Sequence, residues 1–370
     1  MRMTRREFAW GAAAFAAMPV LGRSMAQASS APAFAPEPGP WRHFEITTLV
    51  DIKEPDGAVQ AWIPIPSFSG EDWMRPGETS WRSATGKVEQ VADPNSGAAM
   101  LHATWAQGEK APSIEVVSRF SGRDRAVAVD EPNVAAELSP ELRERYTAAT
   151  ELLPTEGIVG ALAFKITQGA KTDAEKAFRI YDWIVVNTFR DANTRGCGVG
   201  DIASMIKTDN LGGKCADLNA LYVGLARAVG LPARDIYGIR VAPSNFGYKS
   251  LGAKNETITK AQHCRAEVFI ESVGWVPVDP ADVRKVVLEE PPGNLEMNDP
   301  KVEAARQTLF GAWETNWLAY NDAHDVVLPG SEGPMLPFLM YPQAETAAGR
   351  LDPLDADLFS YTITAKEIAS

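Results

Sequence analysis

A cysteine, a histidine and an aspartate, far apart in this sequence, form the set that could do chemistry. Cys215 lies in GGKCAD (212–217), His263 lies in QHCRAEVF (262–269), and Asp279 ends GWVPVD (274–279). In such a set the imidazole takes the proton of the thiol, and the carboxylate fixes the tautomer of the imidazole. The three residues therefore predict nucleophilic catalysis through a thioacyl intermediate.

The position of Cys215 supports this role. Apolar residues recur after it with helical spacing until Gly230 and Pro232 end the pattern; they are Leu218, Leu221, Tyr222, Leu225 and Val229. Cys215 therefore falls at or near the first turn of a helix, where free N–H groups and the helix dipole stabilise a thiolate and an oxyanion. Lys214 adds positive charge beside it. The alternative is a buried cysteine that acts as a small hydrophobic residue.

The other two residues are expected on neighbouring strands. Residues 262–270 alternate, so that Cys264 and its even-numbered neighbours share an apolar face and His263 points the other way. Residues 274–278 form the next strand. A turn of odd length between the two strands, or an even one with a bulge, puts His263 and Asp279 on the same face. We interpret His43 and His102, which have no such partner, as structural.

The elements around these residues predict an α+β fold. Alternating apolar residues at 44–52, 59–65 and 114–120 indicate strands, so 41–130 is expected to be a small antiparallel β domain. Thr172-x-x-Glu175 is a capping box, and it precedes a helical face of Phe178, Tyr181, Ile184 and Val185. The nucleophile helix, packed on an antiparallel sheet, completes a catalytic domain over 131–300.

The segment after residue 300 carries an aromatic cluster that has helical character. It consists of Trp313, Trp317, Tyr320, Asn321 and His324. We expect 301–370 to be an extension that packs on the core. A substrate-contacting lid, in which Asp322 or Asp325 takes part, is the alternative.

The first 28 residues are predicted to be an export signal. A twin-arginine pair, Arg5-Arg6, is followed by a short apolar stretch and by Ala26-Gln27-Ala28, which has the form of a cleavage site. This predicts a twin-arginine (Tat) signal over 1–28, a flexible lead-in over 29–40 and a periplasmic protein. A short membrane anchor is the alternative, but we expect no stable membrane insertion after cleavage.

Composition narrows the functional classes. The 370 residues carry a net charge of −12 and no long basic run, so nucleic acid is not an expected partner. Three cysteines are too few for a disulfide scaffold. A disulfide between Cys197 and Cys264 would leave Cys215 free in an oxidising compartment, and we take this pairing as a hypothesis.

These motifs together resemble a known family, the bacterial transglutaminase-like proteins of the papain-like cysteine-enzyme superfamily. The resemblance rests on GGKCADLNALYVGLARAVGLPAR (212–234), on His263 and on GWVPVDP, and it covers about 137–285. It implies a papain-like α+β core with Cys215 as nucleophile, His263 as general base and Asp279 as its orienting carboxylate. Many relatives have an aromatic residue where this chain has Arg265, whereas Glu267 is retained.

The sequence therefore predicts an exported cysteine enzyme that acts on protein or peptide amides, more as a hydrolase or protease than as a cross-linker. The alternative is a non-catalytic binding module of the cell envelope. A metal site made of Cys215, His263 and Asp279 is a weaker third interpretation, because a fourth ligand is missing from the pattern. No calcium loop and no cofactor site are predicted, and the expected partners are a peptide substrate and the Tat machinery.

Overall fold

Three antiparallel sheets and seven helices dominate the part of the chain that the computed structural model describes, which is residues 33–70, 72–130, 136–271 and 273–369. The predicted export signal lies outside these residues. The helices are α1 Pro140–Thr147, α2 Gly157–Thr167, α3 Asp173–Asn187, α4 Ile202–Lys207, α5 Cys215–Ala228, α6 Pro280–Glu289 and α7 Pro300–Thr308. None of them is long and apolar enough to cross a membrane.

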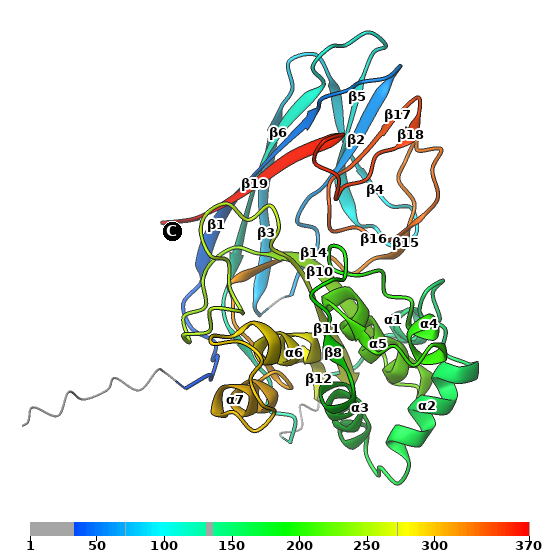
Figure 1. Cartoon of the computed structure of the whole chain (residues 1–370), viewed down its shortest axis with the longest axis vertical. Helices are drawn as coiled ribbons and strands as arrows, with labels where there is room; N and C mark the ends of the chain where they lie inside the picture. The colour runs from blue at the N-terminus through cyan, green and yellow to red at the C-terminus, as the bar shows by residue number, and fades with distance from the viewer. Residues whose placement is uncertain (1–32, 71, 131–135, 272, 370) are drawn as a thin grey trace, which may run out of the picture. The chain divides into compact units, whose positions relative to one another are not determined.

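Two sheets share strands from both ends of the described chain. The first has the order β19 Phe359–Ile368, β1 Arg42–Ile52, β6 Ser113–Gly122, β3 Met74–Arg82. The second has the order β18 Gly349–Arg350, β17 Gln343–Thr346, β2 Val59–Pro64, β5 Ala99–Trp105, β4 Lys87–Ala92. Three strands from beyond residue 340 thus complete sheets that begin with β1 and β2, and Figure 1 shows β19 beside β1.

The strands predicted near the amino terminus are found where the alternation placed them. β1 buries every second residue over most of its length, and Phe44, Val50 and Ile52 are fully enclosed. Apolar residues of β1, β2, β5 and β6 meet in one cluster between the two sheets. Burial of such faces is the main favourable contribution to the folding of a sheet pair.

The third sheet carries the residues of interest. Its order is β12 Gly274–Val278, β11 Gln262–Ile270, β10 Ala233–Arg240, β14 Trp317–Asn321. The β11–β12 ladder pairs Ile270 with Gly274, so the connecting turn has an odd length, which is one of the two arrangements expected from the sequence. Helix α5 packs on this sheet, and Figure 1 shows it alongside β10 and β11. The mixed α+β fold predicted from the sequence is therefore confirmed.

Three further pairs of short strands form two-stranded sheets. β8 Phe189–Arg190 pairs in parallel with β9 Gly212–Gly213, directly before α5. β7 Arg125–Ala126 pairs with β13 Ala312–Trp313, and β15 His324–Val326 pairs with β16 Leu336–Phe338. The helical character expected around 313–324 is wrong, because this segment forms β13, β14 and β15. The aromatic residues of this segment happen to have helical spacing. β14 nevertheless pairs with β10 as a strand of the third sheet and is buried along its whole length.

Helix α3 shows one further departure from the pattern. Its start is as predicted, since the Thr172 hydroxyl accepts the Glu175 N–H and the Glu175 carboxylate accepts the Lys171 N–H. Tyr181, Ile184 and Val185 are buried, but Phe178 is 47% exposed. The buried face runs through Ala177 and Ile180 instead, and Phe178 packs edge-on against Phe310 at its margin.

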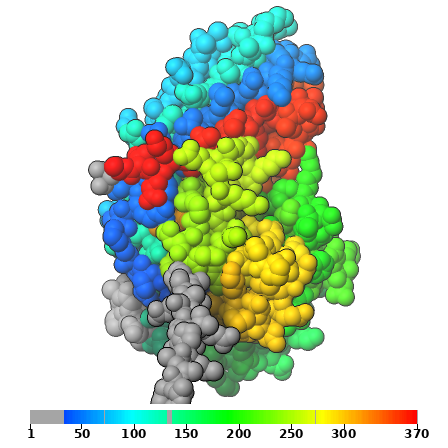
Figure 2. Space-filling view, turned by 60° about the vertical axis from the view of Figure 1, so that its left-hand side comes forward, coloured from blue at the N-terminus to red at the C-terminus, as the bar shows by residue number. Residues whose placement is uncertain are grey.

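The long connection between β10 and β11, residues 241–261, joins distant parts of the chain. Ile258 N–H donates to the carbonyl of Ile363 on β19, and the Tyr248 hydroxyl donates to the carbonyl of Lys301 on α7. Figure 2 shows this yellow-green connection between the red β19 and the gold region of α6 and α7. The connection therefore links the sheet of β1 to the helices beside the third sheet.

Candidate active site

Cys215 is the first residue of α5. The Asp217 side chain packs closely against the backbone of the preceding loop and holds the start of the helix in place. Asp217 accepts the Lys214 N–H with one carboxylate oxygen, and accepts the Val199 and Gly200 N–H groups with the other, at 2.9–3.0 Å. A Cβ at Gly198 would lie 1.8 Å from the Asp217 carboxylate, and the φ of Gly198 is +96°, so only glycine fits. The loop before α5 is thus fastened to the helix start.

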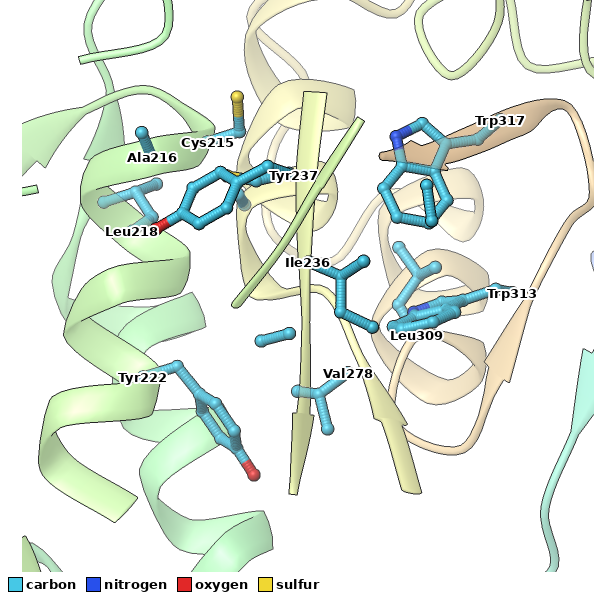
Figure 3. Packing of buried hydrophobic residues seen from close by; sticks show 14 of the residues in the cluster. Cys215, Ala216, Leu218, Tyr222, Ile236, Tyr237, Val278, Leu309, Trp313 and Trp317 are labelled. Atoms are coloured by element: carbon cyan, nitrogen blue, oxygen red, sulfur yellow. The ribbon is translucent and has the colours of Figure 1, made fainter. Parts of the chain in front are cut away.

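This loop brings Cys197 next to Cys215. The Ala216 N–H donates to the Cys197 carbonyl at 2.9 Å, and the Cys197 thiol donates to the Gln262 carbonyl at 3.3 Å. Figure 3 shows the Cys215 sulfur pointing out from the end of α5. All three cysteines are free and buried, so the hypothetical Cys197–Cys264 disulfide is not formed in this structure. Both thiols instead contribute to lowering the pKa of Cys215.

His263 lies on β11 and is held at two points. Its Nε2 is 2.8 Å from Asp279 Oδ2, and its backbone carbonyl accepts the Trp317 indole N–H at 2.8 Å. Nε2 is engaged by the carboxylate, which leaves Nδ1 for the Cys215 thiol, and a hydrogen bond from His263 contributes to lowering the Cys215 pKa. The structure therefore brings Cys215, His263 and Asp279 together, each at most 3% exposed.

Asp279 is positioned by the start of α6. It is the N-cap of that helix, and its Oδ1 accepts the Asp282 N–H at 3.0 Å. Asn219, one turn into α5, donates from Nδ2 to the Cys264 carbonyl at 2.8 Å and lies 3.4 Å from Asp279 Oδ1. The dipole of α6 and these donors favour the ionised carboxylate, against the cost of complete burial.

A second carboxylate beside His263 was not predicted from the sequence. Asp282 Oδ1 lies 3.5 Å from His263 Nε2 and 2.5 Å from Arg240 Nη2. His263, Asp279 and Asp282 form a group whose ligand atoms lie within 4.8 Å of one another, a set that differs from the predicted metal site because Cys215 is not in it. Arg240 and Arg265 contact its two carboxylates, and their charges oppose a bound cation.

The surroundings shift the pKa values of the thiol and the imidazole in opposite directions. Hydrogen bonds from Cys197, then Cys264 and His263, hold the pKa of Cys215 well below its ordinary value, although burial acts against them. Burial and Arg240 lower the pKa of His263, but Asp282 and Asp279 outweigh them and raise it. The hydrogen bond to Cys215 and burial raise the pKa of Cys197 well above its ordinary value. Cys215 is thus the thiol most easily ionised.

The opposite face of the β10–β11 pair is closed by tryptophans. Figure 3 shows Tyr237 pointing toward α5, while Trp313 and Trp317 lie on the other side of the strands. Trp313 and Trp317 are 1% and 2% exposed, and Arg265 lies over both rings. The predicted aromatic cluster therefore belongs to the core. Arg265 is buried and lies 3.7 Å from Asp279.

A cavity of about 680 Å³ opens onto Cys215 and His263. Gln262 also lines it, and the Nε2 of this side chain is a buried donor that has no acceptor within the described part of the protein. Buried donors are normally satisfied, so an unpaired one at a cavity next to a nucleophile is a candidate for contact with substrate. No pattern in the sequence points to Gln262, because only its position beside the cavity distinguishes it.

Comparisons with known proteins agree with this geometry. A family model described as "Transglutaminase-like superfamily" matches residues 160–280, which include Cys215, His263 and Asp279. The chain therefore contains a transglutaminase-like domain over these residues. An uncharacterised protein of Haemophilus influenzae is 32% identical to the transglutaminase-like chain over 343 residues, with 88% of this chain and 91% of that protein covered. The two proteins therefore belong to one family.

Two solved structures are similar to the transglutaminase-like chain. A Cytophaga hutchinsonii protein, named as a candidate cysteine protease, aligns with a TM-score of 0.54 and 13% identity, and covers 89% of this chain and 99% of its own. It shows that the fold is shared. The periplasmic domain of TgpA from Pseudomonas aeruginosa aligns with a TM-score of 0.33 and 16% identity, over 66% of this chain and 88% of that one.

Proposed function

We propose that the protein is an exported, periplasmic cysteine-dependent amide hydrolase in which Cys215, His263 and Asp279 form the catalytic triad. The observation that carries this proposal is the start of α5, where a thiol of lowered pKa faces an imidazole whose Nε2 is 2.8 Å from a buried carboxylate. A thiolate–imidazolium pair is the reactive form of such a site. Export rests on the twin-arginine pattern of residues 1–28.

In the first half-reaction the Cys215 thiolate attacks the carbonyl carbon of an amide. The carbonyl oxygen becomes an oxyanion, to which the backbone N–H of Cys215 and the side-chain N–H of Gln262 donate hydrogen bonds. The C–N bond then breaks, and His263 gives its proton to the leaving amine. Cys215 now carries the acyl group as a thioester, and His263 is neutral.

In the second half-reaction neutral His263 takes a proton from water as the water attacks the thioester. The tetrahedral intermediate collapses, the acid leaves, and the thiolate and imidazolium are restored. Asp279 holds the imidazole in the orientation that both steps need. Basic side chains line the cavity, and their charge opposes a protonated lysine as acceptor, which favours water over transamidation.

Alkylation of Cys215 by iodoacetamide tests this proposal. Because the thiol pKa is lowered, the rate should stay high through neutral pH and fall only as acid protonates the thiolate. His263→Ala removes one cause of the shift, so the rise of the rate should move toward alkaline pH. Peptide mass spectrometry of the mature chain, 29–370, follows Cys215 separately from Cys197 and Cys264, whose raised pKa values predict slow labelling.

The opposite outcome is equally clear. If Cys215 labels with the pH profile of an ordinary thiol, with a pKa near 8.5, and His263→Ala changes nothing, the thiol is not activated. The non-catalytic binding module would then be the better description.

Gln262→Leu separates oxyanion stabilisation from thiol activation. We expect kcat for hydrolysis of p-nitrophenyl acetate to fall by about 10²–10³, the usual cost of removing one oxyanion donor. Iodoacetamide alkylation forms no oxyanion, so its rate should be unchanged in this variant. A kcat within about threefold of the parent protein, well short of that cost, would remove Gln262 from the mechanism.

A further inference from the structure

The wall of the catalytic cavity has the opposite charge to the protein. The whole chain has 48 acidic and 36 basic residues, but the cavity is lined by a single carboxylate, that of Glu289. Seven basic residues line it: Arg190, Arg195, Lys214, Arg240, Lys254, Lys260 and Lys285. They come from several segments of the chain, and the cavity that they line also contains Cys215.

Neighbouring carboxylates neutralise only part of this charge. Arg240 is paired with buried Asp282, and exposed Arg195 is paired with Asp352. Within the described residues, no carboxylate lies within 4.0 Å of the ammonium groups of Lys254 and Lys260, which are exposed at the cavity mouth. The cavity therefore keeps positive charge that is available to a ligand.

Two lysines deeper in the wall are also poorly compensated. Lys214, the residue before the nucleophile, donates from Nζ to the neutral carbonyl of Thr194 at 2.6 Å. Lys285, on α6, is 17% exposed, and its Nζ lies 3.8 Å from one oxygen of Glu289, whose other oxygen is paired with Arg190. Burial, together with Arg240, lowers the pKa of Lys285 to about 8. A buried ammonium that shares its anion is stabilised when a ligand brings another.

The other wall of the cavity is apolar. It is formed by side chains from the carboxyl-terminal part of the chain, namely Tyr341, Leu354, Phe359 and Tyr361. A compact inorganic anion would leave this wall uncovered. A peptide can place carboxylates against the lysines and an apolar side chain against these rings at the same time.

We propose that the substrate is an acidic peptide, with carboxylates beside the reacting amide that pair with Lys214, Lys285, Lys254 and Lys260, and an apolar side chain that packs on Tyr341 and Tyr361. This rests on the proposed function, because the reacting amide is placed at Cys215. The charge pattern adds the specificity, since complementary charge both attracts the ligand and rejects basic competitors.

Calorimetric titration of the Cys215→Ala protein tests binding apart from turnover. The probes are three nine-residue peptides with the same central Val-Gln amide, and four flanking positions occupied by Glu, by Gln or by Lys. We expect the Glu peptide to bind at least about tenfold more tightly than the Gln peptide, because three or four ion pairs contribute about 0.5 kcal/mol each. We expect the Lys peptide to bind most weakly. Raising the salt concentration should reduce the advantage of the Glu peptide.

A matched pair of variants locates the effect. Lys254→Gln/Lys260→Gln/Lys285→Gln should weaken the Glu peptide roughly tenfold and leave the Gln peptide unchanged. Lys110→Gln/Lys171→Gln/Lys207→Gln makes the same change in net charge at exposed positions outside the cavity, and it should leave both peptides unchanged. Lys254→Gln/Lys260→Gln, confined to exposed positions, provides the test if the Lys285 change disturbs folding.

Three results would overturn the proposal. They are equal binding of the Glu and Gln peptides, equal losses in the two triple variants, and tripolyphosphate that binds as tightly as the Glu peptide and competes with it. Failure of the proposed function is seen separately, in the iodoacetamide profile of Cys215. An activated thiol without Glu preference leaves an enzyme for another substrate. If the protein prefers the Glu peptide but Cys215 is not activated, the protein is a binding module for acidic peptides.

Discussion

Cys215→Ala should reduce the hydrolysis of p-nitrophenyl acetate by at least about 10⁴, while the protein keeps its fold. The loss is large because, in the proposed mechanism, the sulfur forms the acyl bond and no other group can complete the cycle. The fold should survive because the change removes one atom at a helix terminus that Asp217 already holds through three backbone N–H groups. Steady-state kinetics and urea unfolding measure the two effects.

Cys197→Ala and Cys264→Ala are the matched controls, since each removes a buried thiol next to the same sulfur. Each variant loses a hydrogen bond that lowers the pKa of Cys215, so the alkaline shift of its rate profile should be measurable while turnover persists. If Cys197→Ala alone abolished turnover and Cys215→Ala did not, the nucleophile would be Cys197. If all three variants kept the parent rate, no cysteine would be catalytic.

Arg240→Met should produce the largest loss of stability. It leaves the Asp282 carboxylate buried without its cation, and removing one partner of such a pair costs about 3–5 kcal/mol. Urea unfolding at pH 7 measures the change in the free energy of unfolding. Arg240→Met/Asp282→Asn should recover most of it, because the unpaired charge is gone.

The pH dependence gives an independent check on this pair. Arg240 and His263 hold the pKa of Asp282 well below its ordinary value, so its contribution to stability is complete above the pKa of the unfolded state. That contribution is lost as pH falls toward the folded-state pKa. The gap in stability between the parent protein and Arg240→Met should therefore narrow below about pH 4, near the reference pKa of an aspartate. A single-variant loss under about 1 kcal/mol at pH 7, well below the cost of breaking a buried pair, would contradict this account.

Local patterns predicted the position of the three central residues because each depends on short-range rules. The helix beginning at Cys215 follows from the glycines before it and the apolar spacing after it, and the placement of His263 and Asp279 follows from strand alternation and an odd turn. Their arrangement within hydrogen-bond distance was inferred, and the structure supplies the 2.8 Å contact of His263 with Asp279.

The residues that the sequence could not indicate act across long separations. Arg240 meets Asp282 from 42 positions away, and Asp217 fastens a loop that lies 17 and 18 positions earlier. No periodicity encodes such contacts. The positive charge of the cavity could not be predicted for the same reason. The net negative charge of the chain does not indicate that basic residues from distant positions lie together. The helical expectation at 313–324 failed because a strand buried on both faces has no alternation to show.

The pairing of β19 with β1 has a consequence for the synthesis of the protein. β1 pairs with β19 from His43↔Ile368 to Ile52↔Phe359, and Phe359 and Tyr361 form part of the cavity wall. A ribosome must therefore release nearly the whole described chain before this wall exists, and contacts over such separations form slowly. A nascent chain would carry the thiol and the imidazole but lack one side of the binding cavity. Translation thereby postpones completion of the cavity until residues 359–361 have been released.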